Sequence, residues 1–247
     1  MDDDLNWRVE EACNNAWPSP RELIHQGWLM RFSGGGIRRT NSVNPLRGIR
    51  GKPDGLIRTA ETLYTSLGRK PIFRVPHIAD DLDDQLRERG YGMAAGSAVL
   101  FCDLAARSFA QVDGVLIERE MSADWHNESH RIGASSELDH TIFAQMIATI
   151  VIPKAFVSIR ADGKTVAKAY GAIDNGLLVV ESVATDPDYR QRGYSRKILT
   201  ALMGWAKREG AEAACLQVLA DNTAARALYA SLGFDHELYR YHYRMNP

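Results

Sequence analysis

Hydrophobic and polar positions follow a regular pattern from residue 114 to the C-terminus. Short apolar or alternating runs predict strands at residues 115–117, 154–160, 165–171, 177–185, 214–219 and 237–244. Apolar residues at helical spacing predict helices at residues 123–134, 137–150, 198–209 and 222–232. Turns at Asp162-Gly163 and Asn175-Gly176 separate three of the strands, as in an antiparallel meander. This order of elements predicts a mixed α/β domain.

The first half of the chain echoes part of this pattern. Predicted helices at residues 60–67 and 79–89 flank a predicted strand at residues 72–75 and end at glycines, as do the last two helices of the second half. The glycine pairs are 22 and 23 residues apart, at Gly68 and Gly90 and at Gly210 and Gly233. This agreement suggests an internal duplication, although unrelated helix–strand–helix units commonly share such lengths.

The segment between residues 28 and 43 is less regular. Residues 28–32 and 38–43 are predicted to pair as a β-hairpin. The pattern assigns no ligand to this hairpin.

Charge and cysteine content narrow the possible functions. The chain has 30 basic and 31 acidic residues and a formal net charge of −1, which argues against a nucleic-acid-binding surface that depends on bulk charge. Cys13, Cys102 and Cys215 are too far apart to form a recognisable metal or redox motif, so we expect a reducing cytoplasm.

The chain shows no targeting pattern. The acidic N-terminus does not resemble a signal peptide. The most apolar window, residues 142–157, is shorter than a bilayer span and is interrupted by polar residues and a proline, so we expect no membrane partner.

The segment YRQRGYSR, residues 189–196, places three arginines around Gly193 at a predicted strand-to-helix turn. The first N–H groups of a helix have no partner within the helix, and the helix dipole attracts anions there. A diphosphate is therefore the expected ligand. The segment lacks the glycine and lysine spacing of a P-loop and the glycine spacing of a dinucleotide fingerprint. The alternative is an ordinary solvated helix start.

Residues 183–195 closely resemble the acetyl-CoA signature of the GNAT superfamily of N-acetyltransferases, whose core is Q/R-x-x-G-x-G/A. Arg190, Gly193 and Ser195 occupy its fixed positions, with serine in place of glycine or alanine. Residues 222–234 resemble a second GNAT segment, N-x-x-A-x-x-x-Y-x-x-x-G-F. The resemblance covers residues 115–247 and implies the GNAT fold, with two splayed parallel strands that receive the pantetheine arm of acetyl-CoA.

The resemblance also implies roles for individual residues. Tyr229 would be the general acid, because a phenol of pKa around 10 can protonate a thiolate of pKa around 8.5. Glu181 would activate the amine directly or through water. The alternatives are that Tyr229 only packs on its helix and that Glu181 is a surface or ion-paired residue.

Acetyl-CoA itself would be bound by the strand, the turn and the following helix. Backbone groups of Val183 and Thr185 would meet the pantetheine amides, and Asn222 would bind the same arm or simply cap its helix. The diphosphate would lie on the turn formed by Arg190, Gln191, Arg192, Gly193, Tyr194, Ser195 and Arg196.

Histidines on the predicted helix at residues 123–134 suggest no metal site. His126 and His130 have the spacing of two metal ligands but lack a third, so we expect no metal. By resemblance, these histidines and Trp125 would line the acceptor pocket.

The first half would be a degenerate GNAT-like domain. If the duplication is real, Leu86 stands where Tyr229 stands in the second half, and Ala79 where Asn222 stands. The corresponding anion-binding turn, residues 48–53, lacks the signature and contains Pro53. We therefore expect a degenerate domain at residues 1–113, a catalytic domain at residues 114–247, and one acetyl-CoA per chain.

The predicted function is acetyl transfer from acetyl-CoA to a primary amine, by direct attack in a ternary complex. The acceptor would be a small molecule or a peptide, because the acceptor pocket carries no readable signature. One competing hypothesis is a non-catalytic acyl-CoA-binding module. A nucleic-acid-binding protein using the basic cluster is the other, which the balanced charge disfavours.

Overall fold

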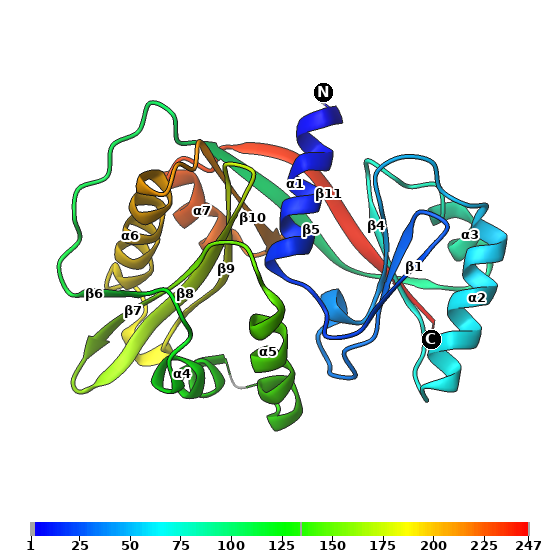
Figure 1. Ribbon diagram of the computed structural model, residues 1–247, viewed down its shortest axis with the longest axis horizontal. Helices are drawn as coiled ribbons and strands as arrows, with labels where there is room; N and C mark the ends of the chain where they lie inside the picture. Colours follow the sequence, from blue (N-terminus) through cyan, green and yellow to red (C-terminus); the bar gives the residue numbers. More distant parts are fainter. Residues whose placement is uncertain (1–2, 134, 247) are drawn as a thin grey trace.

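The computed structural model describes residues 3–133 and 135–246. Within these residues, strands from both halves form one eleven-stranded sheet in the order β1-β2-β3-β4-β11-β5-β10-β9-β8-β7-β6 (Figure 1). The strands are β1 Glu22–His25, β2 Trp28–Arg31, β3 Val43–Pro45, β4 Ile72–Pro76, β5 Gly92–Asp103, β6 Val115–Glu118, β7 Lys154–Ala161, β8 Lys164–Asp174, β9 Leu177–Thr185, β10 Ala213–Leu219 and β11 His236–Met245.

Helices cover both faces of this sheet. They are α1 Asp3–Ala16, α2 Pro53–Ser66, α3 Asp83–Glu88, α4 Ala123–Gly133, α5 Glu137–Thr149, α6 Tyr194–Arg208 and α7 Thr223–Ser231, with short 3-10 helices at η1 Arg38–Thr40 and η2 Pro187–Tyr189. None of the helices in the described part of the chain is long and apolar enough to cross a membrane.

The predicted meander is confirmed as β7, β8 and β9, which pair antiparallel in sequence. Its two turns require left-handed backbone: φ is 50° at Asp162, 78° at Gly163, 45° at Asn175 and 77° at Gly176. Asp, Asn and Gly adopt this conformation most readily, which is why these dipeptides mark tight hairpins.

The two halves repeat one order of elements and exchange a strand. A parallel strand pair, β3 with β4 and β9 with β10, brackets the helices α2 and α6. Each half then continues with a helix and a long strand, α3–β5 or α7–β11. Strand β11 lies between β4 and β5, and β5 lies between β11 and β10. Strand β5 lies before residue 113, but it is hydrogen-bonded to β10 and β11 of the second half. The division of the chain into two domains at residue 113 stays a prediction.

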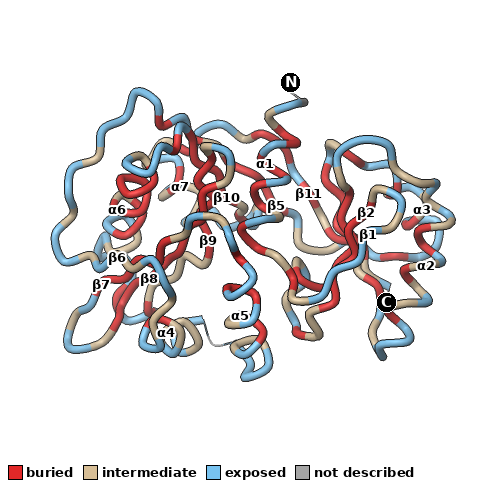
Figure 2. Tube along the Cα trace, in the orientation of Figure 1, coloured by how far each residue is buried: buried red, intermediate tan, exposed pale blue. Residues whose placement is uncertain are grey.

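Apolar side chains form separate cores on the two faces of the sheet. Figure 2 colours the buried residues along the trace of the strands and helices. Helices α6 and α7 pack with β7, β8 and β10 on one face. Helices α1, α4 and α5 pack on the other, so the first helix of the chain belongs to the core of the second half. A third core joins α2 and α3 to β2 and β4.

Several predictions for the first half need correction. The hairpin of residues 28–32 with 38–43 is correct in part: β2 pairs antiparallel with β3, with Met30 opposite Val43, but β3 begins only at Val43 because residues 38–40 form a 3-10 helix, and β2 also pairs with β1. Helix α2 begins at Pro53 rather than at residue 60, since proline is favoured in the first helical turn. Helix α3 is shorter than predicted, and neither α1 nor β5 was predicted.

Candidate active site

The parallel pair β9–β10 opens along its length. Its ladder joins residues 177–180 to 213–216 and then stops. Beyond that point β9 pairs only with β8, and the register shifts where Ser182 adopts a φ of 52°, as in a β-bulge. A cavity of about 960 Å³ lies where the two strands diverge, and it is lined by both of them and by α6 and α7.

The arginine-rich turn leads directly into α6. Gly193 is the N-cap, with a φ of 79°, and no side chain caps the helix. The N–H groups of the first turn are therefore left for another partner. A Cβ added at Gly193 would have no neighbour within 4 Å, so the positive φ is what requires glycine here.

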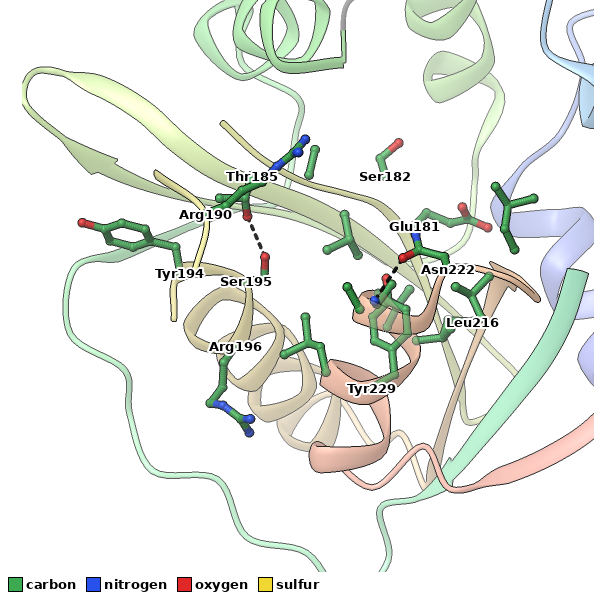
Figure 3. A pocket seen from close by; sticks show the side chains of 18 of the residues that line it. Glu181, Ser182, Thr185, Arg190, Tyr194, Ser195, Arg196, Leu216, Asn222 and Tyr229 are labelled. Carbon is green, nitrogen blue, oxygen red and sulfur yellow. Dashed lines mark hydrogen bonds between the residues drawn. The ribbon is translucent and has the colours of Figure 1, made fainter. Parts of the chain in front are cut away.

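The side chains of the turn divide into two groups. Arg190, Gln191, Gly193, Tyr194, Ser195 and Arg196 line the cavity, whereas Arg192 is not among its lining residues and has its guanidinium 5.0 Å from the ring of Tyr189. The Ser195 hydroxyl lies 2.6 Å from that of Thr185, closing the base of the turn (Figure 3). The Arg196 side chain projects along α6 and donates to the Ser231 hydroxyl at 2.7 Å.

Helix α7 contributes Asn222 and Tyr229 to the opposite wall. The Asn222 side chain accepts from the N–H of Ala225 at 3.1 Å, so it caps α7 as well as lining the cavity. Tyr229 is only 8% exposed. Burial, with a smaller contribution from the Glu181 carboxylate, raises the pKa of Tyr229 to about 12. The phenol therefore keeps its proton throughout the neutral range.

Glu181 lies at the same end of the cavity as Tyr229 (Figure 3). Both of its carboxylate oxygens accept from Arg39, at 2.8 and 2.7 Å. Arg39 also donates to Gln217 Oε1 at 2.9 Å and lies 4.3 Å from the centre of the Trp17 ring. Burial opposes the charge of Arg39, but the Glu181 carboxylate outweighs it, and the pKa of Arg39 is raised.

The first half of the chain thus completes this site. Arg39 and Trp17 line the cavity, although they lie more than 140 positions before Glu181. Neither was predicted, because the contact between Arg39 and Glu181 joins distant segments and leaves no local pattern. Glu181 is ion-paired with Arg39 and also lines the cavity, so its role in activating the amine stays a prediction.

Helix α4 does not place its aromatic residues in this cavity. Trp125 is 2% exposed, donates to the carbonyl of Val157 at 3.1 Å and is not among the lining residues of this cavity, so its place in an acceptor pocket stays a prediction. His126 stacks on His140 with ring centres 3.7 Å apart. The described part of the chain holds no group of three or more His, Cys, Asp or Glu residues that could bind a metal.

Comparison with known proteins places this geometry in a family. A family model described as "Probable histone acetyltransferase Rv0428c C-terminal" matches residues 7–243. The chain is 24% identical over 249 residues to "Uncharacterized N-acetyltransferase YobR" of Bacillus subtilis (strain 168), covering 98% of this chain and 99% of that protein.

Solved structures share the architecture. A GCN5-related N-acetyltransferase from Kribbella flavida superposes with a TM-score of 0.66 at 19% identity, over 99% of this chain and 93% of that one. A tandem GNAT protein from the clavulanic acid biosynthesis pathway gives a TM-score of 0.66 at 12% identity, over 83% and 74% of the two chains. The predicted GNAT fold is therefore confirmed. The chain belongs to the family described as "Probable histone acetyltransferase Rv0428c C-terminal", and it is an acetyltransferase.

Proposed function

We propose that the protein transfers the acetyl group of acetyl-CoA to a primary amine, by direct attack within a ternary complex. One observation carries the proposal: a single cavity between diverging strands is lined at one end by the uncapped start of α6 and at the other by Tyr229 and Glu181. An anion held at the first end and a thioester reaching the second would span the cavity.

The residues fit the acetyl donor as substrate. N–H groups of the first turn of α6, with Arg190 beside them, would bind the diphosphate. The stretch of β9 that has lost its partner on the β10 side, at Val183 and Thr185, would hydrogen-bond the pantetheine amides as a strand edge does. The amide NH₂ of Asn222 is not used in capping α7, and it would serve the same arm.

The reaction requires that the amine lose a proton and that the departing thiolate gain one. The amine nitrogen attacks the thioester carbonyl, the C–N bond forms, and the C–S bond breaks to release a thiolate. Tyr229 would protonate that thiolate, since its phenol is protonated at neutral pH and lines the cavity. Glu181 would accept the amine proton through lone pairs that Arg39 leaves free, directly or through water.

Thiol release from acetyl-CoA, measured across a panel of primary amines, tests the proposal. We expect amine-dependent release that saturates in both substrates without an acetyl-enzyme intermediate. Glu181→Gln should lower kcat/KM, because the neutral amide cannot accept the amine proton. Tight acetyl-CoA binding with no release for any amine would instead favour the non-catalytic acyl-CoA-binding module.

A further inference from the structure

A second cavity, of about 430 Å³, lies beside the first and is built by both halves of the chain. The segment around η1 contributes Arg38 and Arg39, and β11 contributes Tyr241 and Tyr243. Strand β10 forms the shared wall, because Gln217 lines both cavities. The second cavity therefore reaches the catalytic end of the first from another direction.

A hydrogen-bonded junction separates the two cavities. Gln217 Oε1 accepts from Arg39 at 2.9 Å and from the Tyr241 hydroxyl at 3.0 Å. Arg39 is held in turn by the carboxylate of Glu181. A molecule in the second cavity would thus lie one side chain away from the group that we propose accepts the amine proton.

The charge lining the second cavity is positive. Arg38 and Arg39 line it, and no Asp or Glu is among its described lining residues. The Arg39 charge is matched by Glu181, whereas Arg38 is exposed and forms no ion pair among the contacts described, its guanidinium lying 6.0 Å from the centre of the Tyr243 ring. The carboxylate of Asp139, which is not among the lining residues, accepts from the N–H of Gly36 and from the Ser136 hydroxyl.

Resting on the proposed function, we propose that this cavity selects acceptors whose amine is accompanied by an anionic group, a carboxylate or a phosphate, which Arg38 binds. A guanidinium pairs with either anion through charge-assisted hydrogen bonds. The anion would lie between Arg38 and the two tyrosines, with the amine directed past Gln217 toward Glu181. An acceptor with only positive charge would meet Arg38 unfavourably.

Matched acceptors test this selection. The pairs are β-alanine with β-alaninamide for a carboxylate, and O-phosphoethanolamine with ethanolamine for a phosphate. Rates of thiol release are corrected for the fraction of free amine. We expect the anionic member of at least one pair to have a kcat/KM about 10- to 100-fold higher, the effect of one charge-assisted hydrogen bond. The pair that shows the preference identifies the anion.

Variants at position 38 test whether Arg38 causes the preference for anionic acceptors. Arg38→Gln should abolish it and leave the KM for acetyl-CoA unchanged, while Arg38→Lys should retain part of it. Arg58→Gln removes the same charge from an exposed ion pair with Asp54 on α2 and should have no effect. Calorimetry of the preferred anionic acceptor, β-alanine or O-phosphoethanolamine, binding to the CoA-loaded protein should show the same loss in Arg38→Gln.

The outcomes separate the inference from the proposed function. Thiol release without preference for either anion, or a preference that survives in Arg38→Gln, would overturn the inference alone. No thiol release with any amine would overturn both. Release that depends on the anion and on Arg38 supports both.

Discussion

The two halves of the molecule repeat the same elements around a parallel strand pair, and the 960 Å³ cavity opens from the pair of the second half, β9–β10. In the second half, the turn before α6 and Asn222 at the start of α7 both face the cavity. In the first half, Arg50 reaches from the turn before α2 to Asp81, just before α3, with an N–O distance of 2.9 Å. Its guanidinium also lies 5.5 and 5.6 Å from the rings of Trp7 and Trp28. A side chain of the protein thus joins segments that the second half leaves free for a ligand.

The predicted duplication matches an apolar residue of the first half to the tyrosine of the second. Leu86, at the position matching Tyr229, is fully buried in the core of α2 and α3. The first half also supplies Arg39 and Trp17 to the cavity of the second. The comparison teaches that one half of a repeated architecture can contribute side chains to a cavity that opens in the other.

The largest effect should follow from removing the Tyr229 hydroxyl. Tyr229→Phe is expected to lower kcat on the order of 10²- to 10⁴-fold, the usual contribution of a general acid, with little change in acetyl-CoA affinity. Steady-state kinetics and calorimetry measure the two quantities. Tyr64→Phe is the matched control, because Tyr64 is a buried tyrosine of the first half whose hydroxyl donates to the carbonyl of Arg31. It should cost about 1 kcal/mol of stability and leave kcat unchanged. If Tyr64→Phe lowered kcat as much as Tyr229→Phe does, the hydroxyl of Tyr229 would have no role in the reaction that the buried tyrosine of the first half lacks.

The next largest effect concerns the anion-binding turn. Gly193→Val places a β-branched residue at a φ of 79°, which strains the backbone by about 1 to 3 kcal/mol and should weaken acetyl-CoA binding about 5- to 100-fold. Gly48→Val introduces the same strain at a φ of 100° in the corresponding turn of the first half. Calorimetry should show one acetyl-CoA per chain, with unchanged affinity in Gly48→Val. A second bound acetyl-CoA would refute the assignment of the first half as degenerate.

Removing the Arg50 side chain from the first half should lower the stability of the protein without creating an acetyl-CoA site. Arg50→Ala removes the partner of Asp81 and the contacts with Trp7 and Trp28, and we expect a loss of about 2 kcal/mol in the free energy of unfolding. Urea denaturation measures this loss, with Arg58→Ala on the exposed surface of α2 as the control. If the loss is no greater than in the control, the contacts of Arg50 with Asp81, Trp7 and Trp28 do not stabilise the first half.

Local chemistry explains what the sequence could predict. The positive-φ dipeptides at Asp162-Gly163 and Asn175-Gly176 determine their turns on their own, so the meander of the second half was predicted closely. The arginine-rich turn and Tyr229 were likewise found from short motifs, and both line the cavity.

Long-range contacts explain which features could not be predicted from the sequence. Strand β5 begins with glycines and alanines of low strand propensity, and its pairing with β10 and β11 determines its conformation. The pairing of β5 with β11 and the contact of Arg39 with Glu181 join residues more than 130 positions apart. Only the folded chain brings such residues together, so no window of sequence reveals them.

Buried charge gives the last contrast. In the first half, Arg74 is paired with Glu10, and each side chain is 2% exposed. In the second half, Lys168 is 4% exposed; it donates a hydrogen bond to the Ser129 hydroxyl at 2.5 Å and lies 4.5 and 6.0 Å from the centres of the Trp125 and Phe143 rings. Burial lowers the pKa of Lys168 to about 7. The two halves thus tolerate a buried cation in different ways, by pairing or by loss of the proton.

This difference predicts an unusual pH dependence. Between pH 7 and about pH 10 the unfolded chain holds a proton on Lys168 that the folded protein lacks, so stability should rise with pH across this window. The slope should reach about 1 kcal/mol per pH unit, and urea denaturation at pH 7, 8 and 9 measures it. Lys168→Met should remove the slope and be more stable than the parent at pH 7, whereas Lys52→Met, at an exposed position, should keep it. If the slope persists in Lys168→Met, another group causes the rise in stability. Lys168 would then keep its proton when the protein folds.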